Sequence, residues 1–496
     1  MIASLPFIPQ QTSSRAHAAP AATTTARPRL IVVGFDEIVV NKYLPTIRSA
    51  IEEGRLDSYA VIDLASQRQI IEARLAAAAH RPHAVAYVPD AAAFDPALQQ
   101  RAIDEAVRAV SDRGRPVMMY IATEVRAHLP YLQYCAENAI AALVEKPVLA
   151  PLESGTFAPA DITGHMRSLA DRFGGSGCSV MTLSRYHRIY NDRFVTGIRD
   201  RMHRWQTPLT SLHLRAAGGV WNTQTEFASR TDHPYRYGYG MLMHGAYHYI
   251  DLAMQVLALN ADLLPEARLA LDVTAYSVGP ADQHRRVTGP HAAAIGDRGP
   301  RLPAHPDGGH YGETDVTAVF RLYDSDTHHT ITLGTLAFEQ TTPSIRTWPR
   351  LPEGLYNKNG RTSAVDVEAQ IGPLYSAHVH CYDVPSGEDA DRIDAFARLT
   401  ERANAALIPD ESYVESEDFS GVFHSDSNRA LMERWLAGIE TRSSLASHAL
   451  PMRVTEALCL AAASPGTSLT VTDFAPERRA TRLLACRRAD AKLVAP

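Results

Sequence analysis

The sequence predicts an α/β protein with two parts: an N-terminal, doubly wound parallel sheet and a C-terminal α/β domain with a large, mostly antiparallel sheet. Over residues 29–150, short and fully apolar strands alternate with amphipathic helices, which is typical of a parallel sheet covered on both faces. After Pro147 the strands alternate polar and apolar side chains, which favours an antiparallel sheet with one covered face.

The first domain is expected to contain five buried strands and the helices between them. The strands lie at 30–33, 59–62, 84–88, 117–121 and 140–144. The helices lie at 38–53, in the Ala-rich segment that ends near residue 80, at 96–112 and at 126–138. This alternation predicts a Rossmann-like nucleotide-binding domain over 29–150.

The second domain is expected over 151–470. Its alternating strands include 211–215 and 330–336, and helices return at about 428–440 and 451–463. Residues 280–312 are rich in Gly, Pro and His and are interpreted as a long loop or insertion. Residues 471–496 are expected to form a short strand and a tail, and residues 1–28 a disordered tail.

The composition is that of an ordinary globular protein, with 496 residues of which 45% are hydrophobic, 21% charged, and a formal net charge of −6. A mildly acidic chain is poorly suited to nucleic-acid binding through phosphate neutralisation, and no apolar run is long enough to cross a membrane. The N-terminal residues lack the features of a secretory signal. The five cysteines are far apart in the sequence, which argues against a disulfide framework and against a structural zinc site. The same pattern favours a reducing, cytoplasmic location.

The turn after the first strand carries only part of a dinucleotide-binding motif. That motif has glycine at positions 34, 36 and 39, and only Gly34 is present. Asp36 and Glu37 place carboxylates at the N-terminus of the following helix, where they stabilise the helix dipole but repel a pyrophosphate. Two interpretations stay open: an altered cofactor site, or a turn that binds nothing.

Two further strand ends carry polar residues that indicate a ligand site. Asp63 ends the second strand, where a carboxylate can bind an adenosine ribose and favour NAD over NADP; the alternative is a helix cap or turn residue. Glu145, Lys146 and Pro147 close the fifth strand at the carboxyl edge, where doubly wound sheets bind ligands. Only four of the 49 basic residues are lysines. A solvated strand-end lysine is the alternative for Lys146.

A helix is expected from about Leu242, with His244 and His248 four residues apart on one face. Asp251 follows His248 by three residues and is able to orient it. Gly245 stands where a zinc-protease motif needs glutamate, which excludes that motif. There are two alternatives to a catalytic role for these histidines. They could bind a metal ion together with a third group, or they could be core histidines with satisfied hydrogen bonds.

These elements, in this order, resemble the Gfo/Idh/MocA oxidoreductase family from Arg29 to about Ser464. The segments that carry the resemblance are Ile121-Ala122-Thr123 with His128, Val144-Glu145-Lys146-Pro147-Val148, Ser184-Arg185-Tyr186-His187, and Gly245-Ala246-Tyr247-His248-Tyr249-Ile250-Asp251. The combination of Glu-Lys-Pro with a later Gly-x-x-His-x-x-Asp helix is the specific part. Glucose-6-phosphate dehydrogenase shares the Glu-Lys-Pro run, but its phosphate-binding turn and its Arg-Ile-Asp-His run are absent from the sequence.

The resemblance implies a Rossmann domain, a nicotinamide cofactor and a sugar or cyclitol substrate. It implies that Lys146 contacts the substrate and helps to position the nicotinamide, that Pro147 is cis, and that His248 is the general acid/base. The substrate-side residues are then His244, Arg185, Tyr186, His187 and Asp251. The cofactor-side residues are Gly34, Asp36, Asp63, Thr123, His128 and Glu145. The cofactor is NAD or NADP, with NAD favoured by Asp63, and no metal is expected.

The chain departs from the family pattern in three places: the missing glycines, His244 where the family usually has aspartate, and Glu124-Val125 where it usually has Pro-Asn. The leading hypothesis is an NAD(P)-dependent oxidoreductase acting on a hydroxyl or carbonyl of a sugar-like or secondary-metabolite substrate. The alternatives are a member that has lost redox function (a cofactor-free acid/base catalyst or a binding protein) and an NAD-assisted glycosidase. The expected partners are a small-molecule substrate and copies of the chain, as a homodimer or homotetramer, without nucleic acid or membrane.

Overall fold

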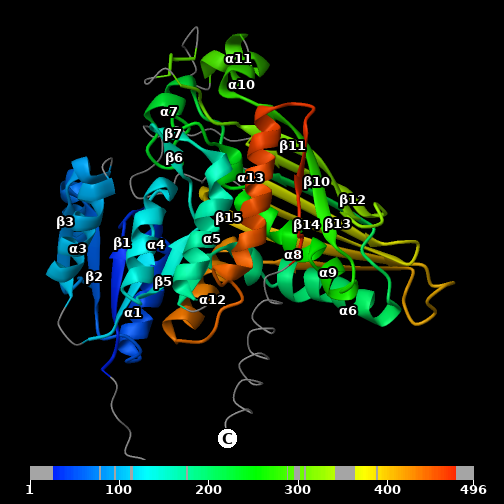
Figure 1. Ribbon diagram of the computed structural model, residues 1–496, viewed down its shortest axis with the longest axis horizontal. Helices are drawn as coiled ribbons and strands as arrows, with labels where there is room; N and C mark the ends of the chain where they lie inside the picture. Colours follow the sequence, from blue (N-terminus) through cyan, green and yellow to red (C-terminus); the bar gives the residue numbers. More distant parts are fainter. Residues whose placement is uncertain are drawn as a thin grey trace, which may run out of the picture.

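The computed structural model describes residues 26–77, 80–93, 96–111, 115–174, 177–287, 289–294, 302–305, 309–340, 363–386 and 389–475. Most of the predicted 1–28 tail, the tail beyond 475 and part of the 280–312 segment therefore lie outside the described residues. The predicted fold class is confirmed, because a parallel sheet with helices is followed by a large and mostly antiparallel sheet (Figure 1).

The parallel sheet has six strands in the order β3-β2-β1-β4-β5-β8. They are β1 (Arg29–Val33), β2 (Tyr59–Leu64), β3 (Ala84–Val88), β4 (Val117–Ile121), β5 (Ala141–Glu145) and β8 (Cys178–Met181). The first five lie where the sequence predicts them. β8 comes from the range assigned above to the second domain. The chain leaves β1 toward β2 on one side and reaches β4 on the other, so a ligand crevice is expected at the carboxyl ends of β1 and β4.

Helices cover both faces of this sheet. One face packs on α3 (Pro96–Val110), α4 (His128–Glu137) and α5 (Ile162–Phe173). The other packs on α1 (Leu44–Glu52), α2 (Arg68–Ala77) and α12 (His424–Leu436). A π-helical turn, Val39–Tyr43, leads into α1. Since α12 comes from late in the chain, the C-terminal part completes the cover of the N-terminal sheet (Figure 1).

The second sheet has nine strands in the order β16-β15-β14-β13-β9-β12-β11-β10-β17, and only the β9–β12 pair is parallel. They are β9 (Ser211–Ala217), β10 (Leu269–Val278), β11 (Asp315–Asp324), β12 (Thr330–Glu339), β13 (Ser363–Ile371), β14 (Tyr375–Ser386), β15 (Asp389–Ala403), β16 (Val414–Ser420) and β17 (Ser468–Val471). The predicted alternation is confirmed: along β13, buried and partly exposed residues alternate without a break.

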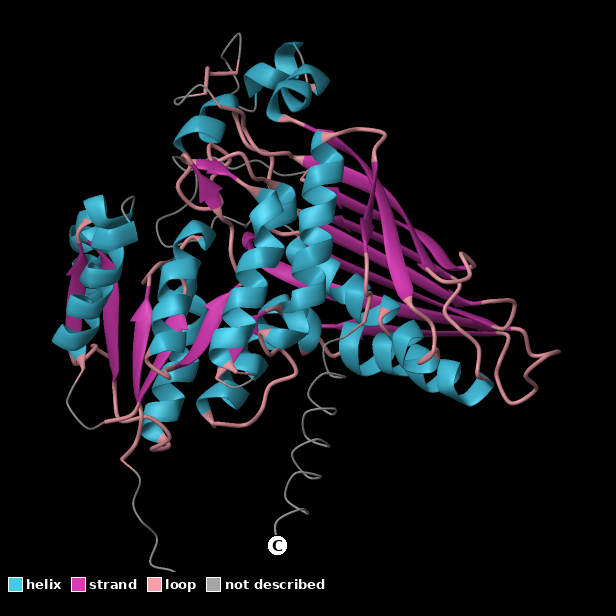
Figure 2. Cartoon of the chain, viewed as in Figure 1, coloured by secondary structure: helices cyan, strands magenta, loops and turns pink. Residues whose placement is uncertain are grey.

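The covered face of this sheet packs on four helices, which lie along one side of it (Figure 2). They are α6 (Thr196–Trp205), α8 (Tyr247–Leu257), α9 (Leu259–Leu263) and α13 (Ala449–Ala463). α13 contacts both α5 and β10, so it joins the two halves of the molecule. Within the described ranges, no helix is long and apolar enough to cross a membrane.

Part of the segment predicted as a long loop is helical, which corrects that prediction. α10 (Pro280–Arg286) and α11 (Gly289–Ala294) lie near α7 (Gln224–Ser229) and the short β6 (Leu152–Glu153) and β7 (Thr156–Phe157) at one end of the molecule (Figure 1). Pro280 occupies the first turn of α10, and the Asp282 carboxylate accepts a hydrogen bond from the Gly279 N–H. These are helix-start signals that a count of Gly and Pro overlooks.

Gly334 gives a test of the pairing between β12 and β9. A Cβ atom at this position would lie 1.8 Å from the carbonyl oxygen of Leu212 and 2.5 Å from the Phe320 ring. We expect Gly334→Ala to lower the free energy of unfolding by about 2 kcal/mol or more, measured by urea denaturation. Gly164 lies in α5, where an added Cβ atom would meet no neighbouring atom within 4 Å. As the control, Gly164→Ala should stabilise the protein by ~0.5–1 kcal/mol, and equal effects of the two substitutions would contradict the strand register.

Candidate active site

Lys146 lies at the carboxyl edge of the parallel sheet, directly after β5, and its peptide bond to Pro147 is cis, as the resemblance implies. The Nζ atom donates a hydrogen bond of 2.7 Å to the carbonyl oxygen of His244. Burial lowers the pKa of Lys146 to about 8; Glu145 acts against this shift, and Lys42 adds to it. In the described part of the chain, no carboxylate forms an ion pair with this ammonium group.

The neighbouring carboxylate is already engaged. Tyr120, fully buried in β4, donates a hydrogen bond of 2.7 Å to Oε1 of Glu145. The Tyr120 ring packs edge-on against Tyr43, with the ring centroids 5.6 Å apart. Glu145 is therefore fixed against the sheet by a tyrosine, and its charge acts on Lys146 without an ion-pair contact in the described structure.

His128 fixes the loop that carries Lys146. Its ring is buried, with Nε2 3.0 Å from the carbonyl oxygen of Thr123 and Nδ1 3.1 Å from that of Pro147. Burial lowers the pKa of His128 to about 4, so the ring is neutral near pH 7. A neutral imidazole donates from one nitrogen only, so His128 hydrogen-bonds one of these two carbonyl oxygens and packs against the other, between the end of β4 and the turn after β5. The Thr123 hydroxyl beside it is buried and has no hydrogen-bond partner in the described structure.

The turn after β1 is closed by Asp36. Gly34 has φ +83°, and a Cβ there would lie 2.9 Å from the Ala122 carbonyl oxygen, so only glycine fits without strain. Asp36 Oδ1 accepts a hydrogen bond of 2.9 Å from the Val39 N–H and caps the first helix. Burial, with Glu145 adding to it and the Val39 N–H acting against it, raises the pKa of Asp36 to about 6. A carboxylate therefore occupies the helix N-terminus where a pyrophosphate binds in doubly wound folds.

Asp63 also holds this turn. Its two carboxylate oxygens accept hydrogen bonds from the N–H groups of Phe35, at 2.8 Å, and Leu64, at 2.7 Å. Burial raises the pKa of Asp63, against these two hydrogen bonds. Arg74 donates to the Phe35 carbonyl oxygen at 2.9 Å, which fixes the turn from the other side. These contacts match the turn-residue interpretation of Asp63 and leave its ribose-binding role a prediction.

His244 does not lie on a helix with His248, which corrects the prediction. Met241–Met243 form a 3₁₀ turn, α8 begins at Tyr247, and His244 has φ −101° and ψ −102°. The physical reason is the local hydrogen-bond pattern: the N–H groups of His244 and Ala246 both bond to the Met241 carbonyl oxygen at 3.1 Å, so a turn and not a helical ladder precedes α8. Glu313 holds this turn, since its carbonyl oxygen accepts from the Met241 N–H at 2.9 Å and its carboxylate accepts from the Leu242 N–H at 2.8 Å.

The His244 ring lies in a pocket of aromatic rings. Its centroid is 5.1 Å from that of His233, 5.0 Å from Tyr235 and 5.7 Å from Tyr239. The side chain is buried, and its Nε2 atom has no hydrogen-bond partner in the described structure. Burial holds the pKa of His244 well below its usual range, and His233, Arg230 and Lys146 add to this effect. The ring is therefore a neutral, enclosed imidazole with an unsatisfied nitrogen.

His248 is connected to Asp251 through two hydroxyl groups. The His248 Nδ1 atom lies 3.1 Å from the Thr182 hydroxyl, which lies 2.9 Å from the Ser184 hydroxyl, and Ser184 donates to the Asp251 carboxylate. The Leu183 N–H makes a longer contact of 3.4 Å with Nδ1. Sequence reasoning missed Thr182 because β8, which places it, was not predicted as a strand.

Arg185 is engaged with Asp251. Its Nε atom donates to Oδ2 of Asp251 at 2.9 Å, and its Nη2 atom donates to the Ser447 carbonyl oxygen at 3.0 Å. Burial would raise the pKa of Asp251, but Arg185 and His448 hold it below its usual value. The carboxylate is fully buried and stays charged because the guanidinium compensates it.

The two residues after Arg185 also contact protein. The Tyr186 hydroxyl accepts from the Arg442 N–H at 2.8 Å. His187 is buried, with its ring stacked 4.0 Å from that of Tyr190, and its Nε2 atom has no partner in the described structure. Substrate contacts by Arg185, Tyr186 and His187 stay a prediction.

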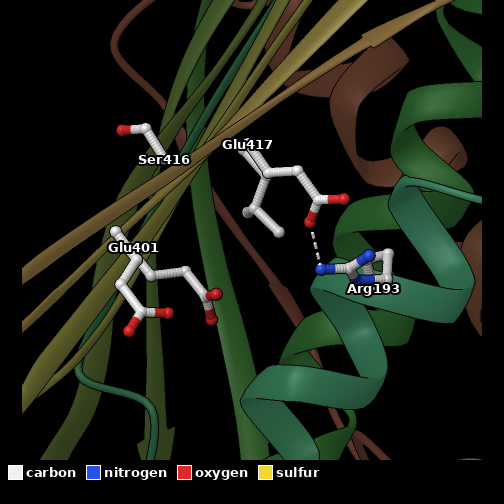
Figure 3. Close-up of a pocket in the computed structure, with 6 residues that line it drawn as sticks. Arg193, Glu401, Ser416 and Glu417 are labelled. Carbon is white, nitrogen blue, oxygen red and sulfur yellow. Dashed lines mark hydrogen bonds and ion pairs between the residues drawn. The ribbon is translucent and has the colours of Figure 1, made fainter. Parts of the chain in front are cut away.

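A pocket of about 430 Å³ lies elsewhere, beside β15 and β16. Its wall contains three glutamates, and Arg193 pairs with Glu417 across it (Figure 3). None of the predicted site residues lines it. Within the described ranges, no group of three or more His, Cys, Asp or Glu side chains is arranged to hold a metal ion.

Comparisons with known proteins identify the fold but not the family. No protein-family model matches the sequence, and no curated protein matches it. An oxidoreductase domain protein from Kribbella flavida is similar in structure, with a TM-score of 0.52 and 11% identity over 90% of this chain and 99% of that chain. Levoglucosan dehydrogenase, solved with NADH and levoglucosan, has a TM-score of 0.50 and 11% identity, with the same coverage. At this identity the likeness shows a shared fold.

Arg185 gives a test of the buried carboxylate. We expect Arg185→Met to lower the free energy of unfolding by roughly 3–5 kcal/mol, because it leaves the Asp251 charge buried without its guanidinium. Arg398→Met is the control: its partner is Asp418, and both side chains are exposed. That substitution should cost less than about 1 kcal/mol. Similar losses for both variants in chemical denaturation would contradict the assigned role of Arg185.

Proposed function

We propose that this chain is a Gfo/Idh/MocA-type oxidoreductase that transfers hydride between a nicotinamide dinucleotide and a hydroxyl or carbonyl group of a sugar-like or secondary-metabolite substrate. The observation that carries the proposal is the hydrogen bond from the Lys146 ammonium to His244, four residues before His248. It brings a lysine at the carboxyl edge of the parallel sheet next to the segment that enters α8. The shared fold with a dehydrogenase solved with NADH supports the same function.

The residues at the sheet edge fit a dinucleotide, with one obstacle. Gly34 lets the backbone pass close to Ala122, and the buried Thr123 hydroxyl lacks a partner in the described structure. The Gly34 turn, Asp63 and Thr123 would hold the cofactor, whose nicotinamide ring takes up or gives hydride when it is bound. The obstacle is Asp36, which has to become neutral or leave the Val39 N–H before a pyrophosphate can use the helix N-terminus.

His248 is the proposed base, and the hydroxyl groups beside it determine which nitrogen is protonated. Ser184 donates to Asp251, so its oxygen can accept from the Thr182 hydroxyl, and the Thr182 oxygen can then accept from Nδ1–H of His248. The Leu183 N–H points at the same nitrogen from 3.4 Å and competes with this order; where Nδ1 donates to Thr182, Nε2 is the nitrogen without a proton. Nε2 then takes the proton of the substrate hydroxyl as hydride leaves the carbon, and Lys146 polarises the same oxygen.

Asp36 favours one other candidate function. A carboxylate at the helix N-terminus is what a protein without a dinucleotide would use to cap that helix. A member of this fold that has lost redox function and keeps Lys146 and His248 for acid/base chemistry is therefore the second candidate. Under both candidate functions, assembly into a homodimer or homotetramer stays a prediction.

The pH dependence of cofactor binding separates these candidates. Because the pKa of Asp36 is raised to about 6, its carboxylate is charged at pH 8 and largely neutral at pH 5.5. We therefore expect NAD⁺ or NADP⁺ to bind roughly ten- to a hundred-fold more tightly at pH 5.5 than at pH 8, measured by calorimetry, since the neutral fraction of Asp36 rises from about 1% to about 75%. Asp36→Asn should bind as tightly at pH 8 as the parent chain does at pH 5.5.

The control for this experiment is Asp200→Asn, on the exposed surface of α6, which should keep the pH dependence of the parent chain. If neither the parent chain nor Asp36→Asn binds either dinucleotide at any pH, the oxidoreductase proposal is wrong. The second candidate, a protein of this fold that has lost redox function, is then favoured. If Asp36→Asn binds with the affinity and pH dependence of the parent chain, Asp36 is not the obstacle.

Thr182→Val tests the hydroxyl chain, because valine keeps the shape of threonine and removes its hydroxyl group. We expect kcat to fall by roughly ten- to a hundred-fold with little change in KM, and the acidic limb of the pH–rate profile, which reports the pKa of the base His248, to move. Thr182→Ser is the matched control and should restore most of the rate. An unchanged pH profile in Thr182→Val would remove the hydroxyl chain from the mechanism.

A further inference from the structure

We propose that the substrate carries an oxyanion, a carboxylate or a phosphate, that binds between the Lys146 ammonium and the ring of His244. This inference rests on the proposed function, since it names the chemical class of the substrate for that site. It is carried by two groups at one junction: a lysine that bonds to the backbone of His244 and has no ion-pair partner in the described structure, and the buried, unsatisfied Nε2 atom of the same His244, whose ring the Lys146 charge affects.

The first observation is the charge of Lys146. The carboxylate that acts on Lys146, that of Glu145, already accepts a hydrogen bond of 2.7 Å from the Tyr120 hydroxyl. The ammonium group has three N–H donors, and the described structure uses one of them, toward His244. A charge removed from water without a counter-ion is costly, and a bound anion offsets that cost.

The second observation is the set of groups that face Lys146 from the elements packed around it. They are Glu145 on β5, Lys42 on the π-helical turn, His128 on α4, and His233 and His244 on the segment before α8. The three histidines are neutral near pH 7 because burial lowers their pKa values, to about 4 for His128 and about 3 for His233. Of the charged groups that act on Lys146, Glu145 is the anion and Lys42 is a second cation, and the imidazoles add N–H donors rather than charge.

The third observation is the position of the unsatisfied nitrogen. His244 is nine-tenths buried, and its ring is fixed by His233, Tyr235 and Tyr239. In a neutral imidazole one nitrogen carries a proton, so Nε2 can donate to an oxyanion that also pairs with Lys146. A neutral hydroxyl group could accept from Nε2, but it would leave the ammonium group without a counter-ion.

Calorimetry with three small probes tests the proposal: D-glucuronate, D-glucose 6-phosphate and D-glucose, which differ in the charge at one carbon. We expect at least one of the two anions to bind roughly ten-fold or more tightly than glucose, corresponding to about 1.4 kcal/mol. The anion that binds more tightly shows whether the substrate's oxyanion is a carboxylate or a phosphate. His244→Asp should remove the preference, because its carboxylate pairs with Lys146 and repels the anion. His213→Asp, on the exposed face of β9, is the matched control and should keep the preference.

Glucose binding as tightly as both anions would overturn the proposal, as would the absence of binding by either anion. A preference that survives in His244→Asp, in a variant with the melting temperature of the parent chain, would also overturn it. If His244→Asp does not fold, His244→Asn replaces it: it removes the ring without adding a charge and should weaken the preference by several-fold. Dinucleotide binding, measured in the same samples, fails or succeeds independently and so tests the proposed function separately.

Discussion

The hydrogen bond from Lys146 to the His244 carbonyl oxygen is the contact on which the site depends, because it joins the two halves of the chain. On one side, His128 fixes the turn after β5 through the backbone of Thr123 and Pro147. On the other side, Glu313 holds the turn before α8 by accepting hydrogen bonds from the Met241 and Leu242 N–H groups. A lysine at this junction is partly removed from water, and its lowered pKa follows from that burial.

Two charges of opposite sign lie at the carboxyl edge of the parallel sheet, one in the turn after β1 and one at the Lys146 junction. At the turn, Asp36 puts a carboxylate where a dinucleotide needs N–H donors. At the junction, Lys146 is a cation with no ion-pair partner in the described structure. The same fold thus resists one anion and favours another. The proposed oxidoreductase function requires that Asp36 no longer repels the pyrophosphate, either because its carboxylate is protonated or because it moves away from the Val39 N–H.

Much of the fold follows from the sequence, because it depends on local patterns. The apolar runs of β1 to β5 and the alternation along β12 are visible without tertiary information. The position of Lys146 at the end of β5 follows from the apolar run that precedes it. β8 was missed because Cys178–Met181 is a short run whose burial comes from late-chain partners such as Ser443 and Leu445.

The site was predicted less completely, since its geometry comes from contacts between distant residues. The periodicity around His244 favours a helix, yet Met241–Met243 form a 3₁₀ turn that bonds to Glu313, some seventy residues later, and the helix begins only at Tyr247. The predicted link between Asp251 and His248 exists, but it passes through Thr182 and Ser184. Asp63, predicted as a cofactor ligand, makes the contacts of a turn residue with Phe35.

The ionisation of Lys146 tests the central claim most directly. The chain has only four lysines, so protein labelled with carbon-13 at the lysine ε position gives four resolvable NMR signals, and Lys146→Arg identifies the one of interest. We predict that this signal titrates with a pKa of about 8, because the ammonium group is buried at the junction without a counter-ion. A pKa at the ordinary lysine value of 10.5 would contradict the burial of Lys146 and, with it, the account of the site.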